Sequence, residues 1–360
     1  MKRSLLFCLV TLLLWVPLGW AAGPDAASAL SGETEACYRK AEPGATLSVP
    51  ADLLPHEDFR TEWWYVTGNL KGEDGKRYGY QFTIFRRGLA CDADETGVSW
   101  SARHLYFAHL AISSESDKSF HTGYRMERQS FGLSGWHKEP LRIWVADVSF
   151  VWDAGQIHLE TRHGEPGFSL TLEPVKPPVL QGEGGFSVKD PASGSASHYL
   201  TLSRLKTRGT LRLPGRVVEV TGVSWVDREW STGSLGSDQS GWDWLALHLD
   251  DGRDLMVCRV RGTKAAPDYY FGSISLTDGS YRVLGAGEFT MVPYGVLNAP
   301  SGRVYPGRWT VSVPKEAIVL TVTPLFDNQE HGDGVTYWEG AVTARGKGAS
   351  GRGYLEMTGY

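Results

Sequence analysis

Two short segments of the sequence place carboxylic acids beside tryptophans. The first is Glu62-Trp63-Trp64-Tyr65, and the second begins with Trp225-Val226-Asp227-Arg228-Glu229-Trp230 and continues to Trp242-Asp243-Trp244. A carboxyl group on an apolar surface is costly to ionise, so its pKa rises and it can act as a general acid near neutral pH. The face of a tryptophan ring stabilises a nearby cation.

This combination of residues suggests hydration of a carbon–carbon double bond. A protonated carboxyl group would supply the proton, tryptophan faces would stabilise the resulting cation, and a second carboxylate would hold the water that adds. We take Asp227, Glu229 and Asp243 as the candidate catalytic residues. The candidate substrate-binding residues are Glu62, Trp63, Trp64, Tyr65, Arg228, Trp230, Trp242 and Trp244.

The same residues also have a purely structural interpretation. The three candidate acids could form ion pairs with Arg228, Arg259 or Arg261 at an interface between domains. The tryptophans could belong to a packed core, because the indole ring is as useful there as in a pocket. The sequence leaves both interpretations open.

The elements that must position these residues are β-strands. From about Leu47 onward, apolar residues alternate or form short runs broken by Gly, Pro and Asn, at a spacing of roughly ten residues that is typical of antiparallel sandwiches and barrels. Asp-Gly pairs at 74–75, 251–252 and 278–279 predict hairpin turns. The sequence therefore predicts an all-β protein.

Alternate residues of a strand share a face, which sorts the candidate residues. Trp63 and Tyr65 share one face of their strand, and Glu62 and Trp64 share the other. By the same rule, Trp225, Asp227 and Glu229 lie together, whereas Asp243 lies on an apolar face with Leu245, Leu247 and Leu249.

Two regions of the chain resemble each other. Residues 62–87 and 241–262 each place paired tryptophans on a strand, followed by a hairpin with Gly and an apolar strand with Arg at its end. We therefore expect two related β domains, at 51–210 and 211–360, with the boundary near Leu205–Thr221 and an N-terminal extension at 23–50. The stretch 174–197, rich in Pro, Gly and Ser, is either a linker or a long loop.

The N-terminus has the pattern of a secretory signal peptide over residues 1–22. A basic start precedes the apolar run Ser4–Leu18, and small residues then predict cleavage near Ala21 or Ala22. The run is short for a transmembrane helix, although an uncleaved anchor is the alternative. We expect a periplasmic or secreted protein.

The cysteines that would remain after cleavage are three. Cys37 and Cys91 could form a disulfide across the first strand region, and the sequence leaves this pairing open. Cys258 lies in an apolar run, which favours a buried free thiol.

Composition excludes several classes of protein. The 360 residues include 14 Trp, 15 Tyr and 13 Phe, too many aromatics for a disordered chain, and 4 Cys, too few for a disulfide scaffold. The net charge of −5 lacks the basic surplus of a nucleic-acid binder. No zinc-ligand, phosphate-loop or dinucleotide motif occurs, so we expect no metal and no cofactor.

Several long motifs resemble a known family, the bacterial predicted secreted hydrolases grouped with carotenoid 1,2-hydratase (hydroxyneurosporene synthase). The motifs are PHEDFRTEWWYVTGNL, ARHLYFAHLAI, KPPVLQGEGG, GVSWVDREWSTGSLG, GWDWLALHLDDGRDLM and YWEGAVT with GRGYLEMTGY, which span about Pro55 to Tyr360. The resemblance implies two lipocalin-like, calycin-type antiparallel β-barrels in tandem. It also implies a relation to proteins that hydrate or cyclise apolar, polyene-like substrates.

This chain departs from the carotenoid hydratase branch at one motif. That branch carries a version of the Asp-x-x-Trp motif with His, whereas the sequence here is Asp227-Arg228-Glu229-Trp230. Arginine does not release its proton at ordinary pH and cannot act as a proton shuttle. The departure argues against carotenoid hydration itself as the activity.

Three functions are compatible with these features. The first is an exported protein that binds an apolar isoprenoid, polyene or lipid-like ligand and, as a hydratase-like lyase, adds water to its double bond. The second is a non-catalytic periplasmic carrier of such a ligand, with membrane-associated export components as partners. The third is a glycan hydrolase, because paired carboxylates and tryptophan platforms also suit sugars.

Overall fold

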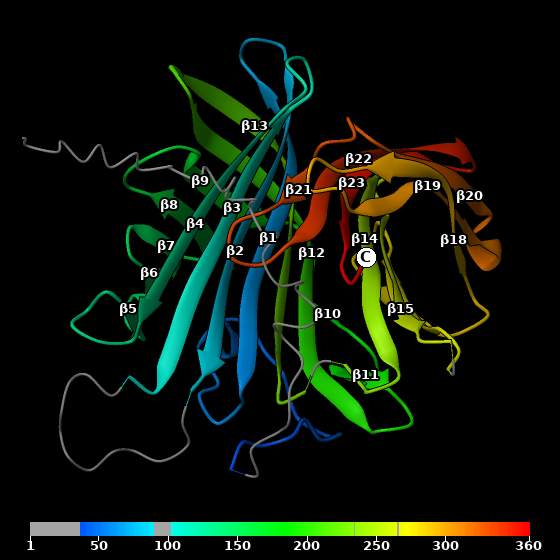
Figure 1. Cartoon of the computed structure of the whole chain (residues 1–360), viewed down its shortest axis with the longest axis horizontal. Coiled ribbons are helices and arrows are strands. Elements are labelled where there is room, and N and C mark those ends of the chain that lie inside the picture. The colour runs from blue at the N-terminus through cyan, green and yellow to red at the C-terminus, as the bar shows by residue number, and fades with distance from the viewer. Residues whose placement is uncertain (1–36, 90–101, 234, 265) are drawn as a thin grey trace, which may run out of the picture.

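The chain is all-β and forms two curled antiparallel sheets that lie side by side (Figure 1). This computed structural model describes residues 37–89, 102–233, 235–264 and 266–360. The first sheet is a nearly closed barrel and the second a half-barrel, which confirms the predicted all-β class with two barrel-like units in tandem. Within the described ranges, no helix is long and apolar enough to span a bilayer.

The first sheet has thirteen strands between Thr61 and Ser231. They are β1 (Thr61–Gly72), β2 (Arg77–Gly88), β3 (His104–Ser114), β4 (Ser119–Arg128), β5 (Ser134–His137), β6 (Leu141–Val145), β7 (Val148–Asp153), β8 (Gln156–Thr161), β9 (Gly167–Pro174), β10 (Val179–Leu180), β11 (Phe186–Asp190), β12 (Ser195–Leu213) and β13 (Arg216–Ser231). Their order is β4-β3-β2-β1-β13-β12-β9-β8-β7-β6-β5, and β10 and β11 both pair with β12. A short 3₁₀ helix, η1 (Ala51–Leu53), precedes the sheet.

The second sheet has ten strands between Gln239 and Met357. They are β14 (Gln239–Leu249), β15 (Asp254–Gly262), β16 (Tyr269–Ser275), β17 (Tyr281–Leu284), β18 (Thr290–Asn298), β19 (Val304–Val313), β20 (Ile318–Pro324), β21 (Glu330–His331), β22 (Tyr337–Lys347) and β23 (Ser350–Met357). Their order is β17-β16-β15-β14-β23-β22-β20-β19-β18, with β21 on β22 and the 3₁₀ helix η2 (Pro314–Glu316) before β20.

The expected hairpins are present, and they occupy equivalent places in the two sheets. The Asp-Gly pairs at 74–75 and 251–252 connect β1 to β2 and β14 to β15, and Gly75 and Gly252 adopt the positive φ that such turns require. In each sheet the first strand also pairs with the last, β1 with β13 and β14 with β23.

The boundary between the sheets differs from the one expected at residue 210. That residue lies inside β12, which forms a long hairpin with β13. Because β13 pairs with both β1 and β12, it belongs to the first sheet, and the change of sheet comes between Ser231 and Gln239. The stretch 174–197 is a loop packed on the first sheet through β10 and β11, not a linker.

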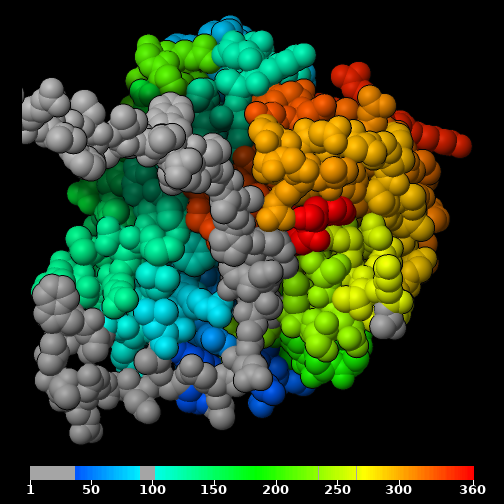
Figure 2. Space-filling model, in the orientation of Figure 1, coloured from blue at the N-terminus to red at the C-terminus, as the bar shows by residue number. Residues whose placement is uncertain are grey.

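The interior of each sheet is filled by its own side chains. Trp64, Phe82 and Leu110 are fully buried in the first interior, and Leu245 and Trp309 are fully buried in the second. Lipocalin-type barrels hold a ligand in the mouth of the barrel. Because the interiors are packed, the space for a ligand lies between the sheets, where side chains of both form one buried cluster. In Figure 2 the orange part of the second sheet touches the cyan part of the first near the top of the view.

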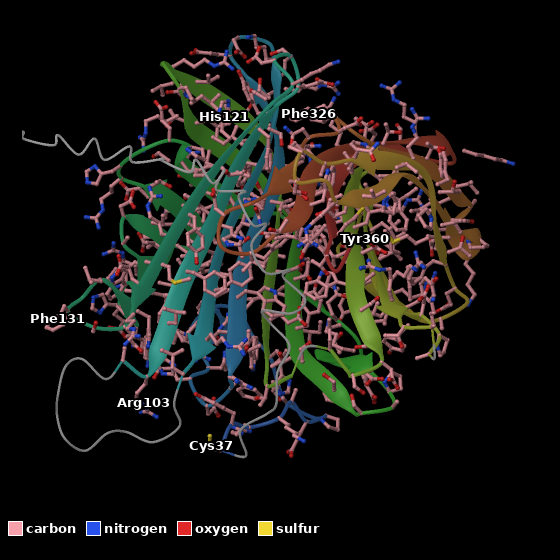
Figure 3. All side chains as sticks on the ribbon, in the orientation of Figure 1. Cys37, Arg103, His121, Phe131, Phe326 and Tyr360 are labelled. Carbon is pink, nitrogen blue, oxygen red and sulfur yellow. The ribbon has the colours of Figure 1, made fainter. Side chains whose placement is uncertain are left out.

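Two of the three cysteines expected in the mature chain, Cys37 and Cys258, lie within the described residues. Cys37, at the lower end of the molecule in Figure 3, is disulfide-bonded, and Cys91 lies outside the described residues. Cys258 is a buried free thiol, as predicted. The proposed signal peptide at 1–22 also lies outside the described residues.

A single glycine allows the two sheets to approach closely. A Cβ atom at Gly79 of β2 would lie 2.4 Å from Cβ of Ala341 in β22, which is too close for any real contact. We expect Gly79→Ala to lower the free energy of unfolding by about 1–3 kcal/mol in a denaturant titration, because the sheets must separate.

Gly332 supplies the matched control for this change. A Cβ atom there meets nothing within 4 Å. Gly332→Ala should leave the free energy of unfolding nearly unchanged. Equal effects of the two substitutions would contradict the packing described here.

Candidate active site

A cavity of about 110 Å³ lies between the outer faces of the two sheets. Strands β1, β2, β3, β11, β12 and β13 form one wall, and β14, β15, β16, β22 and β23 form the other. The lining residues are Trp63, Tyr65, Gln81, Phe85, Phe107, His109, Lys189, Ser197, Tyr199, Asp227, Glu229, Ser231, Leu235, Trp242, Trp244, Cys258, Val260, Phe271, Val335, Tyr337 and Glu356. An aromatic wall with a few convergent polar groups is typical of a site for an organic ligand.

Strand alternation brings six of the candidate residues into this cavity. They are Trp63, Tyr65, Asp227, Glu229, Trp242 and Trp244. Tyr65 pairs directly with Asp227, and Trp63 with Glu229, across β1 and β13, so the four side chains share one face. Trp242 and Trp244 approach from β14 of the other sheet.

Asp227 is a buried carboxyl group held by two hydroxyl donors. Thr201 Oγ1 donates to its Oδ1 at 2.5 Å, and the Tyr199 hydroxyl donates to its Oδ2 at 2.7 Å. Trp244 Nε1 in turn donates to the Tyr199 hydroxyl at 3.2 Å, which links the two sheets. Burial raises the pKa of Asp227 to about 7, although the two hydroxyl donors favour its ionised form.

Glu356 of β23 is a second carboxyl group in the cavity wall. Trp242 Nε1 donates to its Oε1 at 3.1 Å. Burial raises the pKa of Glu356 to about 8, and repulsion from Glu229 and Asp227 adds to this rise. At neutral pH, Glu356 is therefore mostly protonated while Asp227 is partly ionised.

Glu229 differs from both because it has a cationic partner. Lys189 Nζ lies 2.9 Å from Glu229 Oε1. The same ammonium lies over the rings of Tyr199 and Phe271, 4.6 and 4.2 Å from their centroids. The aromatic faces of this cavity thus already stabilise one positive charge.

A hydrogen-bonded chain of neutral groups completes the polar part of the wall. Gln81 Nε2 donates to the Tyr337 hydroxyl at 2.9 Å, and that hydroxyl lies 2.7 Å from Nδ1 of His109. Burial lowers the pKa of His109 to about 3, so the ring is neutral, and in the tautomer protonated at Nε2 its Nδ1 accepts a hydrogen bond from the Tyr337 hydroxyl. The chain joins β2 and β3 to β22.

Four candidate binding residues lie on the opposite face of β1 and β13. They are Glu62, Trp64, Arg228 and Trp230. Glu62 forms ion pairs with Arg86 and Arg228, and the Arg228 guanidinium lies 4.0 Å from the Trp64 ring centroid. This cluster is an internal ion-pair network, and the structural interpretation holds for it.

Asp243 also lies outside the cavity, on the inner side of the second sheet. Arg261 NH1 donates to its Oδ1 at 2.8 Å, and the hydroxyl of Tyr360, which Figure 3 labels, donates to the same atom at 2.8 Å. Burial outweighs these contacts and raises the pKa of Asp243. Asp243 is not among the residues that line the cavity, and its contacts with Arg261 and Tyr360 are those of a structural residue.

Replacement of Asp243 distinguishes a role in stability from a role in ligand binding. We expect Asp243→Asn to lower the free energy of unfolding by about 1–3 kcal/mol, because Arg261 loses its buried partner. The affinity of the cavity for an apolar fluorescent probe should change by less than about twofold, since no cavity contact is lost. Loss of probe binding at unchanged stability would place Asp243 in the site after all.

Several groups that line the cavity were not predicted from the sequence, above all Glu356, Tyr199 and Lys189. Glu356 lies in the final motif, where alternation opposes it to the core residues Leu355 and Met357. That pattern was a usable signal for a carboxyl group facing away from the core. Among the described residues, no group of three or more His, Cys, Asp or Glu side chains could hold a metal ion.

Comparison with known proteins identifies the family to which this chain belongs. Residues 40–360 match the family model described as AttH-like. The crystal structure of a protein assigned as AttH from Nitrosomonas europaea is similar, with 31% sequence identity, a TM-score of 0.79, and coverage of 89% of this chain and 99% of that chain. Among curated proteins, no sequence matches this chain.

Two more distant structures share the fold. Kievitone hydratase from Nectria haematococca has 14% identity and a TM-score of 0.68, with 94% of this chain and 97% of that chain covered. CghA in complex with Sch210972 has 11% identity and a TM-score of 0.55, with 94% and 98% covered. At these identities the likeness extends to the fold alone.

Proposed function

Because the chain belongs to the AttH-like family, we propose that it hydrates a carbon–carbon double bond of an apolar small molecule bound between its two sheets. The observation that carries this proposal is the pair of carboxyl groups in the aromatic cavity. Glu356 holds a proton near neutral pH, and Asp227 is arranged to accept one. The name of one distant relative, kievitone hydratase, is consistent with this chemistry.

Protonation of the double bond is the first step. The Glu356 carboxyl group transfers its proton to one alkene carbon, the π bond breaks, and a tertiary carbocation and the Glu356 carboxylate remain. Burial that disfavours the ionised carboxylate keeps Glu356 protonated near neutral pH, where an ordinary carboxyl group has already lost its proton. The rings of Trp63, Trp242 and Trp244 line the space in which the cation forms.

Addition of water completes the reaction. A water molecule attacks the cation, forms the new C–O bond and releases one proton. Asp227 accepts that proton in its ionised form, which the hydroxyl groups of Tyr199 and Thr201 stabilise. Return of the proton from Asp227 to Glu356, through water, restores the starting state. The net change is the addition of one water molecule to the double bond.

The lining favours this substrate class over a glycan. Most of the cavity wall is aromatic or aliphatic, whereas a glycosidase presents two carboxyl groups across a groove that binds polar rings. A carrier of apolar molecules needs the same aromatic wall but has no use for two buried carboxyl groups, whose desolvation is unfavourable.

Incubation with candidate substrates in ¹⁸O-labelled water tests the proposal. The panel contains prenylated phenols and linear polyenes with a trisubstituted double bond, and the products are analysed by mass spectrometry. Hydration predicts a product heavier by one labelled water. If a compound of the panel binds stoichiometrically but no compound of the panel is converted, the result would support a carrier and overturn the proposal.

The proposal also predicts how the rate depends on pH. Glu356 must hold its proton, so kcat/KM falls as the pH rises through about 8. Asp227 must be ionised, so kcat/KM falls as the pH drops through about 7. We expect a narrow bell-shaped profile with its maximum between these values. A rate that continues to rise above about pH 9 would contradict the assignment of Glu356 as the acid.

A further inference from the structure

A second concave surface, distinct from the cavity, lies on the outer face of the first sheet where the second sheet meets it. This groove has a volume of about 710 Å³ and is lined by β1, β9, β12 and β13 on one side and by the end of the β14–β23 pair on the other. Its basic side chains outnumber its acidic ones. The basic residues are Lys71, Arg204, Lys206, Arg208 and Arg352, and the acidic ones are Glu173 and Asp250.

Strand register arranges part of this set in a regular row. Lys71 pairs with Thr221, Thr221 with Arg208, and Arg208 with Thr171, across four neighbouring strands. Directly paired residues share a face, and neighbouring strands lie about 4.8 Å apart. The row therefore alternates cationic side chains with hydroxyl groups. The backbone positions of its two cationic residues, Lys71 and Arg208, lie about 10 Å apart because one strand separates theirs.

A second row on the same face adds another cation. Lys206 lies two residues before Arg208 on β12, so both side chains point to the same side, and its neighbours in the row are Val223 and Glu173. Arg352 reaches the groove from β23 of the second sheet. Three cations of the first sheet and one of the second thus converge on one concavity.

These four cations form no ion pair with a described carboxylate, although Glu173 of β9 is the direct neighbour of Lys206. Arg204 is different, because it pairs with the buried Asp254 at 2.7 Å. For Lys71, Lys206, Arg208 and Arg352, no carboxylate of the described residues lies within 4.0 Å. The chain as a whole carries a net charge of −5, whereas the basic residues of the groove outnumber its acidic ones.

We propose that this groove binds a phosphate-bearing ligand. A phosphate group offers several charged oxygens to ammonium, guanidinium and hydroxyl donors, and guanidinium binds it through two parallel hydrogen bonds. The lysine and arginine side chains are long and exposed, so they can close on one phosphate group or bridge two. The site uses no residue of the cavity and goes beyond the proposed hydration. The phosphate comes from a soluble phosphate ester or from a phospholipid headgroup.

Charge reversal on β12 tests the site. Binding of inorganic pyrophosphate is measured by calorimetry, and binding to vesicles of phosphatidylglycerol or of phosphatidylcholine is measured by sedimentation. The test variant is Lys206→Glu with Arg208→Glu. The matched control is Arg345→Glu with Lys347→Glu, an exposed pair with the same spacing on β22, outside the groove.

The proposal expects the wild-type protein to bind at least one of the two phosphate probes, and not phosphatidylcholine. The affinity should fall about tenfold or more in the β12 variant and stay close to wild type in the β22 variant. Binding of pyrophosphate alone identifies a soluble ligand, and binding of phosphatidylglycerol alone identifies a lipid headgroup. Absence of binding to both probes, or an equal loss in the two variants, would overturn the proposal.

Discussion

Glu356→Gln should abolish hydration while the cavity still binds its ligand. The amide has nearly the same shape as the carboxyl group and can still accept the hydrogen bond from Trp242 Nε1, but it has no acidic proton to give. Loss of a general acid lowers the rate about 100- to 10,000-fold. The measurement is kcat on the substrate found in labelled water, together with the affinity of the variant for that substrate.

Glu339 provides the matched control for this substitution. It lies directly opposite Glu356 on β22, is fully buried, and accepts a hydrogen bond from the Tyr65 hydroxyl at 2.7 Å. Burial raises the pKa of Glu339 well above its usual value, and Glu339→Gln keeps the shape of the side chain and an acceptor for the Tyr65 hydroxyl. We expect this variant to stay within a few-fold of the wild-type rate. Equal losses in both variants would show that the region needs carboxyl groups for structure, not for proton donation.

Glu62→Gln should produce the largest loss of stability. The Glu62 carboxylate is fully buried between the guanidinium groups of Arg86 and Arg228, and the His56 amide donates to its Oε2 at 3.0 Å. Removal of its charge leaves two buried cations without a counter-charge. Breaking a buried pair in this way costs about 3–5 kcal/mol, which denaturant unfolding would measure.

The stability that Glu62 contributes should depend on pH, and a surface glutamate provides the control for its replacement. Burial opposes the ionised form of Glu62, but the two arginines outweigh it and hold its pKa well below the usual value. This contribution is therefore complete above the ordinary pKa of a glutamate and is lost as the pH falls from there towards the folded value. Glu219→Gln, at an exposed position of β13, should change the free energy of unfolding by less than about 0.5 kcal/mol. A Glu62 variant as stable as this control would contradict the ion-pair network.

Local alternation explains which parts of the site could be predicted from the sequence. The two-residue period of β1 and β13 separates Trp63 and Tyr65 from Glu62, and it groups Asp227 with Glu229. Such a period shows which residues share a face but not what that face contacts. For this reason all three members of Trp242-Asp243-Trp244 were candidates, although Asp243 points into the second sheet.

The remaining members of the site depend on contacts between distant parts of the chain. Tyr199 and Lys189 come from β12 and β11, and Glu356 lies near the C-terminus, far in sequence from Asp227. Only the pairing of β13 with β1 and the face-to-face packing of the two sheets bring them together. Because the expected boundary at 210 assigned β13 to the second domain, the face of β13 that meets β14 could not be predicted from the sequence.

The protonation state of Glu356 is the central claim, and infrared spectroscopy measures it without a known substrate. A protonated carboxyl group has a C=O stretching band that a carboxylate and a glutamine lack. Subtraction of the Glu356→Gln spectrum from the wild-type spectrum removes the contribution of Glu339, because both proteins contain that residue. We expect this difference at neutral pH to show one protonated carboxyl group, which disappears as the pH rises through about 8. A difference spectrum with only a carboxylate band at neutral pH would contradict the account.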